Sequence, residues 1–367
     1  MKSTATIPIT KRFSFNLKQL ISIFVVAFGA IAIYFLVNAI IGGKCGEKCV
    51  MDTLAQTVRV AAPIALAAYC GVMCERAAVI NIGIEGMMLM AAMVGYAVNV
   101  YTFSGFKSTG MDVASAAQTA RITALVFAVI ASGLLAFLHA LVSIKFKSDQ
   151  IISGTVINIL AIGLTGYFYR QFLAQDIPIG PGTFPPVDIP LLSQIPYLGA
   201  IFFSGQKPIV YLMLILTVAI HYVLFYTAWG LRTRAVGENP RAADTLGINV
   251  YRVRYVNVIV GGLIAGLGGA WFTLEAVDVF NPQMTNGNGF IGLAAMIFGN
   301  WSPLGALFGA LIFGLGSSVT TTISIFRPDI PSQFPQMLPY VLTIIVLAGV
   351  VGRATPPAAD GQPYEKQ

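Results

Sequence analysis

The sequence of 367 residues has little charge, since Asp, Glu, Lys and Arg together make up 10% of it. Soluble globular domains carry about 25%. Histidine occurs twice and tryptophan three times, whereas hydrophobic residues make up 56% of the chain. So few polar side chains argue against a soluble enzyme, and the net charge of +7 does not by itself require a nucleic acid partner. The composition predicts one polytopic membrane domain.

Motifs that carry chemistry are scarce as well. The phosphate-binding sequence G-x-x-x-x-G-K-[ST] is absent, so any ATP hydrolysis must come from another subunit. We find no paired carboxylates, histidine cluster or Ser–His arrangement on one face, and we predict no catalytic residue, cofactor or metal. Of the four cysteines, Cys70 and Cys74 read as small packing residues, whereas Cys45 and Cys49 are either bridged or free.

Long apolar runs, in contrast, are abundant. An apolar run of about 20 residues is long enough to cross a hydrocarbon core of about 30 Å as a helix. A shorter stretch, Gly289–Asn300, is either a short crossing or a re-entrant half-helix. The full-length spans are expected at Leu20–Ile41, Leu54–Met73, Ala77–Asn99, Ile122–Ser143, Ile151–Phe172, Pro208–Ala228, Tyr255–Ala276, Leu304–Thr322 and Gln336–Val351.

Basic residues set the orientation of these spans. They cluster before the first span and in the loop 229–254, which the positive-inside rule places in the cytoplasm. Counting Gly289–Asn300 as a crossing gives an all-α protein of about ten transmembrane helices with both termini in the cytoplasm. The expected parts are a cytoplasmic segment 1–19, a transmembrane domain 20–352 with a proline-rich external loop 173–207, and a disordered cytoplasmic tail 353–367.

Three polar residues lie where lipid or packed helices are expected. Asn81 and Glu85 are four residues apart in a predicted span and would share one helical face, and Asn158 lies midway along another span. Polar groups inside spans usually face a protein interior or a water-filled path. We therefore predict that Asn81, Glu85 and Asn158 line a substrate pathway. The competing interpretation is a structural hydrogen-bond cluster that joins helices.

The loop 229–254 contains the signals of a short surface helix. Asn239 is suited to cap its start, with Pro240 at the first helical position, and Gly247 is suited to end it. Ala242, Ala243 and Leu246 would then form a small apolar face. Such a helix fits a groove on another protein, although a helix lying on the lipid surface would look similar.

Here the residues resemble a known family. The Ala-Ala-x-x-x-Gly spacing at Ala242, Ala243 and Gly247 is similar to the coupling-helix motif of bacterial ABC import permeases. Arg241 stands where the general motif has glutamate, which suits the branched-chain amino acid, sugar and nucleoside branch. A glycine-rich span like Gly261–Ala270 is expected after the motif in that branch. The resemblance implies that an ATPase contacts Glu238, Asn239, Pro240, Arg241, Ala242, Ala243, Asp244 and Gly247.

Two further blocks resemble the nucleoside-type permeases of this branch. Cys74–Leu89 is similar to their Ser-Glu-Arg-x-Gly-x-x-Asn-Ile-Gly-x-Glu-Gly-Met-Met block, with Ala78 in place of the usual glycine. Gly289–Ala306 is similar to their late motif. Simple-sugar permeases share most of these residues, so the resemblance leaves nucleosides and related simple sugars open.

The resemblance implies one subunit of a heteromeric importer in a prokaryotic plasma membrane. A second permease subunit (a copy or a sister chain), cytoplasmic ATP-binding subunits and an extracytoplasmic substrate-binding protein or lipoprotein would complete it. This chain would be no enzyme, and would translocate its substrate into the cytoplasm by alternating access. One rival from another class stays open: an ion-coupled secondary transporter or channel in which Glu85, Glu275 and Asp278 bind a proton or cation.

Overall fold

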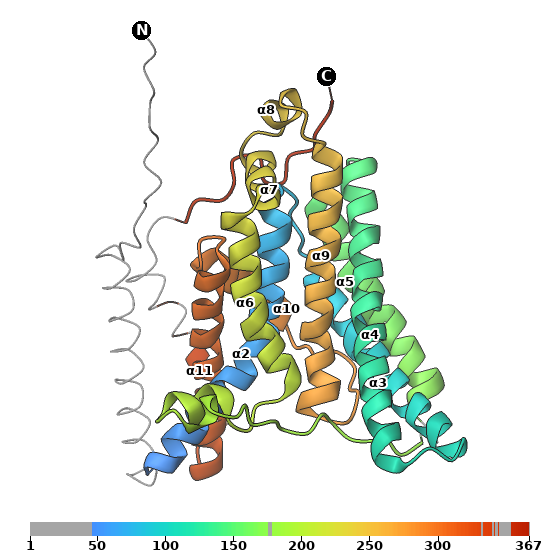
Figure 1. The fold of residues 1–367 in the computed structure, drawn as a ribbon, viewed down its shortest axis with the longest axis vertical. Coiled ribbons are helices and arrows are strands. Elements are labelled where there is room, and N and C mark those ends of the chain that lie inside the picture. Colours follow the sequence, from blue (N-terminus) through green and yellow to red (C-terminus); the bar gives the residue numbers. More distant parts are fainter. Residues whose placement is uncertain are drawn as a thin grey trace.

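The structure is a computed structural model that describes residues 46–366 except 175–177, 332, 340, 342–343 and 345–353. Within that part of the chain all regular elements are helical (Figure 1). The α-helices are α2 (Glu47–Glu75), α3 (Ile84–Ser108), α4 (Val113–Ala140), α5 (Gln150–Phe168), α6 (Pro208–Tyr226), α7 (Ala228–Glu238), α8 (Pro240–Thr245), α9 (Val250–Trp271), α10 (Asn288–Phe298), α11 (Pro303–Phe326) and α12 (Gln333–Gln336). Short π-helical turns extend α4, α5 and α9 to Lys145, Leu173 and Ala276.

Seven of the described helices are long and apolar enough to cross a membrane. They overlap seven of the predicted spans, while α10, with 11 residues, is about 16 Å long and covers half a crossing. The span predicted at 20–41 and the segment 1–19 lie outside the described residues, and most of the span at 336–351 does too. The protein is therefore a polytopic membrane protein whose described part is all-helical.

The helix α2 is the centre of the bundle. It packs against α9, α10 and α11, and nearly all of its apolar stretch is buried, whereas only a third of the stretch is buried in α5 and α6. Small residues permit the close packing: a Cβ on Gly292 of α10 would lie 2.4 Å from the Cβ of Ala67 in α2. The core is thus built by backbones that approach one another closely.

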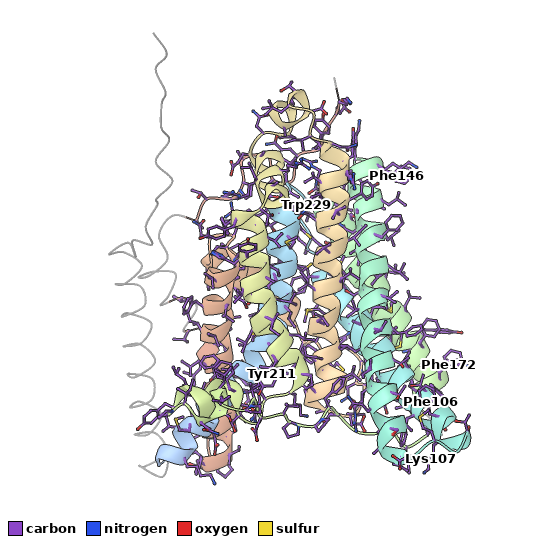
Figure 2. The ribbon with its side chains drawn as sticks, viewed as in Figure 1. Phe106, Lys107, Phe146, Phe172, Tyr211 and Trp229 are labelled. Atoms are coloured by element: carbon purple, nitrogen blue, oxygen red, sulfur yellow. The ribbon has the colours of Figure 1, made fainter. Side chains whose placement is uncertain are left out.

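The outside of the bundle is apolar. On α4, the exposed side chains of Ile122, Val126, Ile130 and Leu134 are four residues apart and therefore share one face. Interfacial aromatic side chains accompany this surface in membrane proteins. Figure 2 labels Trp229 toward the α8 end of the bundle and Tyr211 toward the opposite end.

The helix predicted from Ala77 begins seven residues later, at Ile84. Residues 76–83 form a non-helical connection, in which Ala78 adopts a left-handed backbone conformation with a φ of 61°. A right-handed helix cannot continue through this conformation. The glycine that the related block carries at this position would adopt it without a Cβ penalty.

The tail was expected to be disordered, but the structure packs residues 354–366 (the tail) against the α8 end of the bundle. Tyr364 is buried and its ring lies 5.3 Å from that of Tyr251. The Arg254 Nη1 donates to the carbonyl of Gln362 at 2.9 Å. The prediction failed because the tail has no apolar pattern of its own, and its order comes from groups supplied by α7 and α9.

Candidate functional site

The Glu85 side chain joins two helices that are 200 residues apart in sequence. Its Oε1 accepts hydrogen bonds from the Thr285 hydroxyl at 2.6 Å and the Gly287 N–H at 2.8 Å. Its Oε2 accepts from the Gly289 N–H at 2.7 Å. Glu85 lies in the first turn of α3, and Gly287 and Gly289 lie at the start of α10. The carboxylate therefore lies where two helices present unpaired N–H groups, and both helix dipoles favour its charge.

Asn158 of α5 makes a similar connection to the start of α3. Its Oδ1 accepts from the Gly86 N–H at 2.7 Å, and its Nδ2 donates to the Ile82 carbonyl at 3.0 Å. A Cβ on Gly86 would lie 2.9 Å from the Asn158 Cα, so only glycine fits. We call Glu85, Asn158, Thr285, Gly287 and Gly289 the mid-bundle site.

Asn81 does not share a helical face with Glu85, contrary to the prediction. It precedes α3, is fully buried, and its Oδ1 accepts from the Gly83 N–H at 3.1 Å. Its Nδ2 lies 3.6–3.7 Å from the sulfur atoms of Cys70, Cys74 and Met87. Because the connection 76–83 interrupts the helix, Asn81 faces α2 and stabilises this turn.

A pocket of about 220 Å³ adjoins the mid-bundle site. Its walls come from α3, α5, the start of α10 and the connection before α10. Its lining residues are Glu85, Gly86, Leu89, Asn158, Ile162, Gln283, Thr285, Asn286, Gly287 and Phe290. Two of the three predicted pathway residues thus border the same pocket, and Asn81 does not.

The sequence interpretation missed the contribution of the connection 281–287 to this pocket. That segment reads Asn-Pro-Gln-Met-Thr-Asn-Gly, a polar run directly before a short apolar helix. Gln283 and Asn286 both have positive φ angles, of 60° and 45°. The sequence did contain one signal for this contribution, namely a run of polar residues before an apolar segment too short to cross the membrane.

The rival interpretation grouped Glu275 with Glu85 and Asp278, and the structure does not support that group as a cation site. Glu275 is 3% exposed, and its Oε1 accepts from the Ile209 N–H at 2.5 Å. Among the described residues no cluster of three or more His, Cys, Asp or Glu side chains is suited to hold a metal ion.

The second region is the α7–α8 segment (residues 228–249), which lies at one end of the bundle (Figure 1). The predicted short helix is present as α8. The Asn239 Oδ1 accepts from the Ala242 N–H at 3.0 Å, Pro240 is its first residue, and Gly247 follows it with a φ of 80°. Its local geometry therefore follows from the capping signals of the sequence.

The apolar face of α8 differs from the prediction in one residue. Ala243 is buried in a cluster with Val236, Val253 and Tyr364, so it holds α8 to the bundle. Leu246, in contrast, is 80% exposed, and Ala242 is exposed as well. The outward apolar surface at α8 thus consists of Ala242 and Leu246, beside the exposed side chains of Arg241 and Thr245.

The tail packs against the α7–α8 segment. The Ala359 N–H donates to the Gly237 carbonyl at 2.9 Å, next to Glu238 at the end of α7. Burial raises the pKa of Asp360 to about 6, although the neighbouring Glu75 side chain, the Gly361 N–H and the charge of Arg254 act in the opposite direction. The tail therefore brings a partly buried carboxyl group against the bundle.

Comparison with known proteins identifies the class. Residues 53–347 match the family model described as the permease component of the branched-chain amino acid transport system. The chain belongs to this family.

Individual relatives show which permeases the chain is similar to in sequence. The chain is 41% identical over 319 residues to the guanosine ABC transporter permease protein NupQ of Bacillus subtilis, covering 84% of this chain and 95% of the relative. It is 40% identical over 307 residues to the nucleoside ABC transporter permease protein NupC of Lactococcus lactis, covering 83% and 93%. The putative glucose ABC transporter permease protein TsgC13 of Haloferax volcanii is 32% identical over 81% of this chain and 91% of its own length. No solved structure matches the chain.

Proposed function

We propose that the chain is the membrane-spanning permease subunit of an ATP-driven importer that carries nucleosides into the cytoplasm. The likeness to NupQ and NupC over more than nine tenths of their length is the observation that carries this proposal. TsgC13 is less similar and covers less of the chain, so nucleosides take precedence over simple sugars. The relatives are named as ABC transporter permeases, which does not favour an ion-coupled transporter.

The protein would have about ten membrane crossings in a prokaryotic plasma membrane, with both termini in the cytoplasm. The seven described spans and the half-length α10 support this topology. Basic residues gather at the α8 end of the bundle, so by the positive-inside rule that end would face the cytoplasm. They are Arg76, Lys145, Lys147, Arg232, Arg234, Arg241, Arg252 and Arg254.

Cytoplasmic ATP-binding subunits would supply the energy by docking on α8. The helix is capped at both ends, anchored through Ala243 and exposes Leu246, so it is suited to move as a rigid body with a partner. Glu238, Asn239, Pro240, Arg241, Ala242, Ala243, Asp244 and Gly247 form or support this contact. A second permease subunit and an extracytoplasmic substrate-binding protein would complete the transporter. Closure of the ATPase pair would then open and close the pathway in alternation.

The test is uptake of labelled guanosine, uridine and D-ribose in cells that carry the complete transporter, with Leu246→Glu in this chain. Leu246→Glu removes an outward apolar contact without disturbing a buried group, so nucleoside uptake and copurification of the ATPase should both fall. Leu191→Glu is the matched control, because Leu191 is 79% exposed and lies in the loop between α5 and α6. Ribose uptake that falls in place of nucleoside uptake would contradict the substrate. Unchanged uptake with Leu246→Glu would contradict the docking role of α8.

A further inference from the structure

The polar groups that border the mid-bundle pocket fall into two sets. Glu85 and Asn158 already hydrogen-bond to backbone N–H and carbonyl groups of α3 and α10 and of the connections that precede them. Thr285 donates its hydroxyl proton to Glu85. These three side chains hold the walls in place: Glu85 accepts three hydrogen bonds, Thr285 gives up its only hydroxyl proton, and Asn158 bonds through both its oxygen and its nitrogen.

Gln283 and Asn286 form the second set. Both side chains are exposed and border the pocket, and neither amide group hydrogen-bonds to any residue in the described part of the chain. Each amide offers one acceptor oxygen and two N–H donors. Both residues adopt left-handed backbone conformations, and Gln283 in particular has no local reason to favour one. The chain thus holds two uncommitted amides beside the pocket at a conformational cost.

Phe290, in the first turn of α10, supplies an aromatic ring to the same pocket. It is 47% exposed, although it lies on a short helix whose opposite side is packed against α2. Leu89 and Ile162 add apolar wall on α3 and α5. Among the described residues that line the pocket there is no lysine or arginine to pair with a phosphate group.

An aromatic ring beside two free amides is the chemistry that recognises a nucleobase. Bases stack on aromatic side chains, and Asn and Gln amides pair with the donor and acceptor groups on base edges. We propose that this pocket is a nucleobase subsite of the permease, in which Phe290 stacks on the base and Gln283 and Asn286 hydrogen-bond its edge. Glu85 and Asn158 are positioning residues in this subsite. The inference rests on the proposed transport of nucleosides and assigns the contacts to the base, while the described lining residues offer no cationic side chain for a phosphate group.

The experiment compares labelled guanosine and uridine uptake in cells carrying the complete transporter with Phe290→Leu, Phe290→Trp or Phe127→Leu in this chain. Phe290→Leu keeps apolar volume but removes the stacking ring, and should lower uptake of both nucleosides about tenfold. Phe290→Trp keeps a stacking ring and should restore uptake. Phe127→Leu is the matched control, since Phe127 is 50% exposed on the apolar outside of α4. The amount of each variant in the membrane is measured in parallel.

The amide contacts are tested by selectivity, which a structural role would not change. Gln283→Ala and Asn286→Ala should alter the ratio of guanosine to uridine uptake about fivefold, because the two bases present different edges. Loss of uptake with both Phe290→Leu and Phe290→Trp, or unchanged ratios in the amide variants, would overturn the subsite. If the unaltered transporter carries no nucleoside at all, the proposed function fails instead.

Discussion

The mid-bundle site and the α7–α8 segment are built by opposite kinds of contact. Glu85 bonds to Thr285 across 200 residues of sequence, whereas Asn239 bonds to Ala242 three residues away. The first site exists only when α3 and α10 are already packed. The second forms from local capping, and packing merely attaches it to the bundle. In the proposed transporter the pathway would be held by the whole fold, and α8, as the proposed docking helix, would keep its shape as it moves.

The comparison predicts the largest effect at a close backbone contact in the mid-bundle site. A Cβ on Gly289 would lie 2.7 Å from the Glu85 Cα, so Gly289→Val should lower the free energy of unfolding by about 3 kcal/mol and abolish uptake. Gly163→Val in α5 is the control, because a Cβ there meets no atom within 4 Å. Thermal unfolding in detergent measures both variants. If both variants lost the same free energy of unfolding, the loss would come from placing valine in a helix and not from the close contact at Gly289.

The next largest effect is expected at Glu85, and it distinguishes a residue that positions the pocket walls from one that contacts the substrate. Glu85→Gln leaves N–H groups of the α10 start without a charged acceptor, and should cost about 2 kcal/mol of stability. Thr285→Val removes one donor, and the double variant should reveal a coupling of about 1 kcal/mol between the two side chains. Unfolding in detergent and nucleoside uptake are measured together. A Glu85→Gln variant with full stability and no uptake would contradict a positioning role and restore Glu85 as a pathway residue.

A smaller effect is expected where the tail supports the α7–α8 segment. The pKa of Asp360 is about 6 in the docked tail, above its ordinary value of 3.8, so the docked state binds the proton more tightly. Docking is therefore favoured below pH 3.8 and weakens as the pH rises through about 6. Digestion of the tail by a carboxypeptidase should accelerate over that range.

Asp360→Asn supplies the control for this pH dependence. The amide resembles the protonated carboxyl group and carries no charge at any pH, so the digestion rate should no longer follow the ionisation of residue 360. The same pH dependence in Asp360→Asn and in the unaltered protein would show that another group controls tail docking.

The smallest effect concerns the connection 76–83, which touches both regions. Its Ile82 carbonyl accepts a hydrogen bond from Asn158, and a Cβ on Gly237 of α7 would lie 2.4 Å from the Arg76 carbonyl oxygen. Ala78→Gly should raise stability by about 1 kcal/mol, because the φ of 61° suits glycine. Ala97→Gly, within α3, should lower stability by about 0.5–1 kcal/mol. Thermal unfolding of both variants measures these two changes in stability. A loss of stability in Ala78→Gly would contradict backbone strain at residue 78.

The accuracy of the sequence interpretation followed the range of the contacts. The described spans, the half-length α10 and the cap, first residue and end of α8 were all predicted, because hydrophobic length and capping are local properties. The α3 start was wrong because Ala78 turns the chain by adopting a conformation that its residue type does not favour. Gln283, Asn286 and Phe290 were missed because the polar run before α10 marks a connection but does not show that it borders the same pocket as Glu85.

By itself the sequence determined that this chain crosses a membrane many times and presents a capped helix at one end, since apolar length, charge and capping act over one or a few turns. Only the tertiary structure decided that Glu85 and Asn158 hold the walls of a pocket, that Ala243 is buried under α8, and that the tail is ordered. The physical reason is that a hydrogen bond to a buried N–H group depends on where a distant segment comes to lie. The chemistry of a side chain specifies which hydrogen bonds it can make. The fold decides whether those hydrogen bonds are already made within the protein or remain open to a ligand.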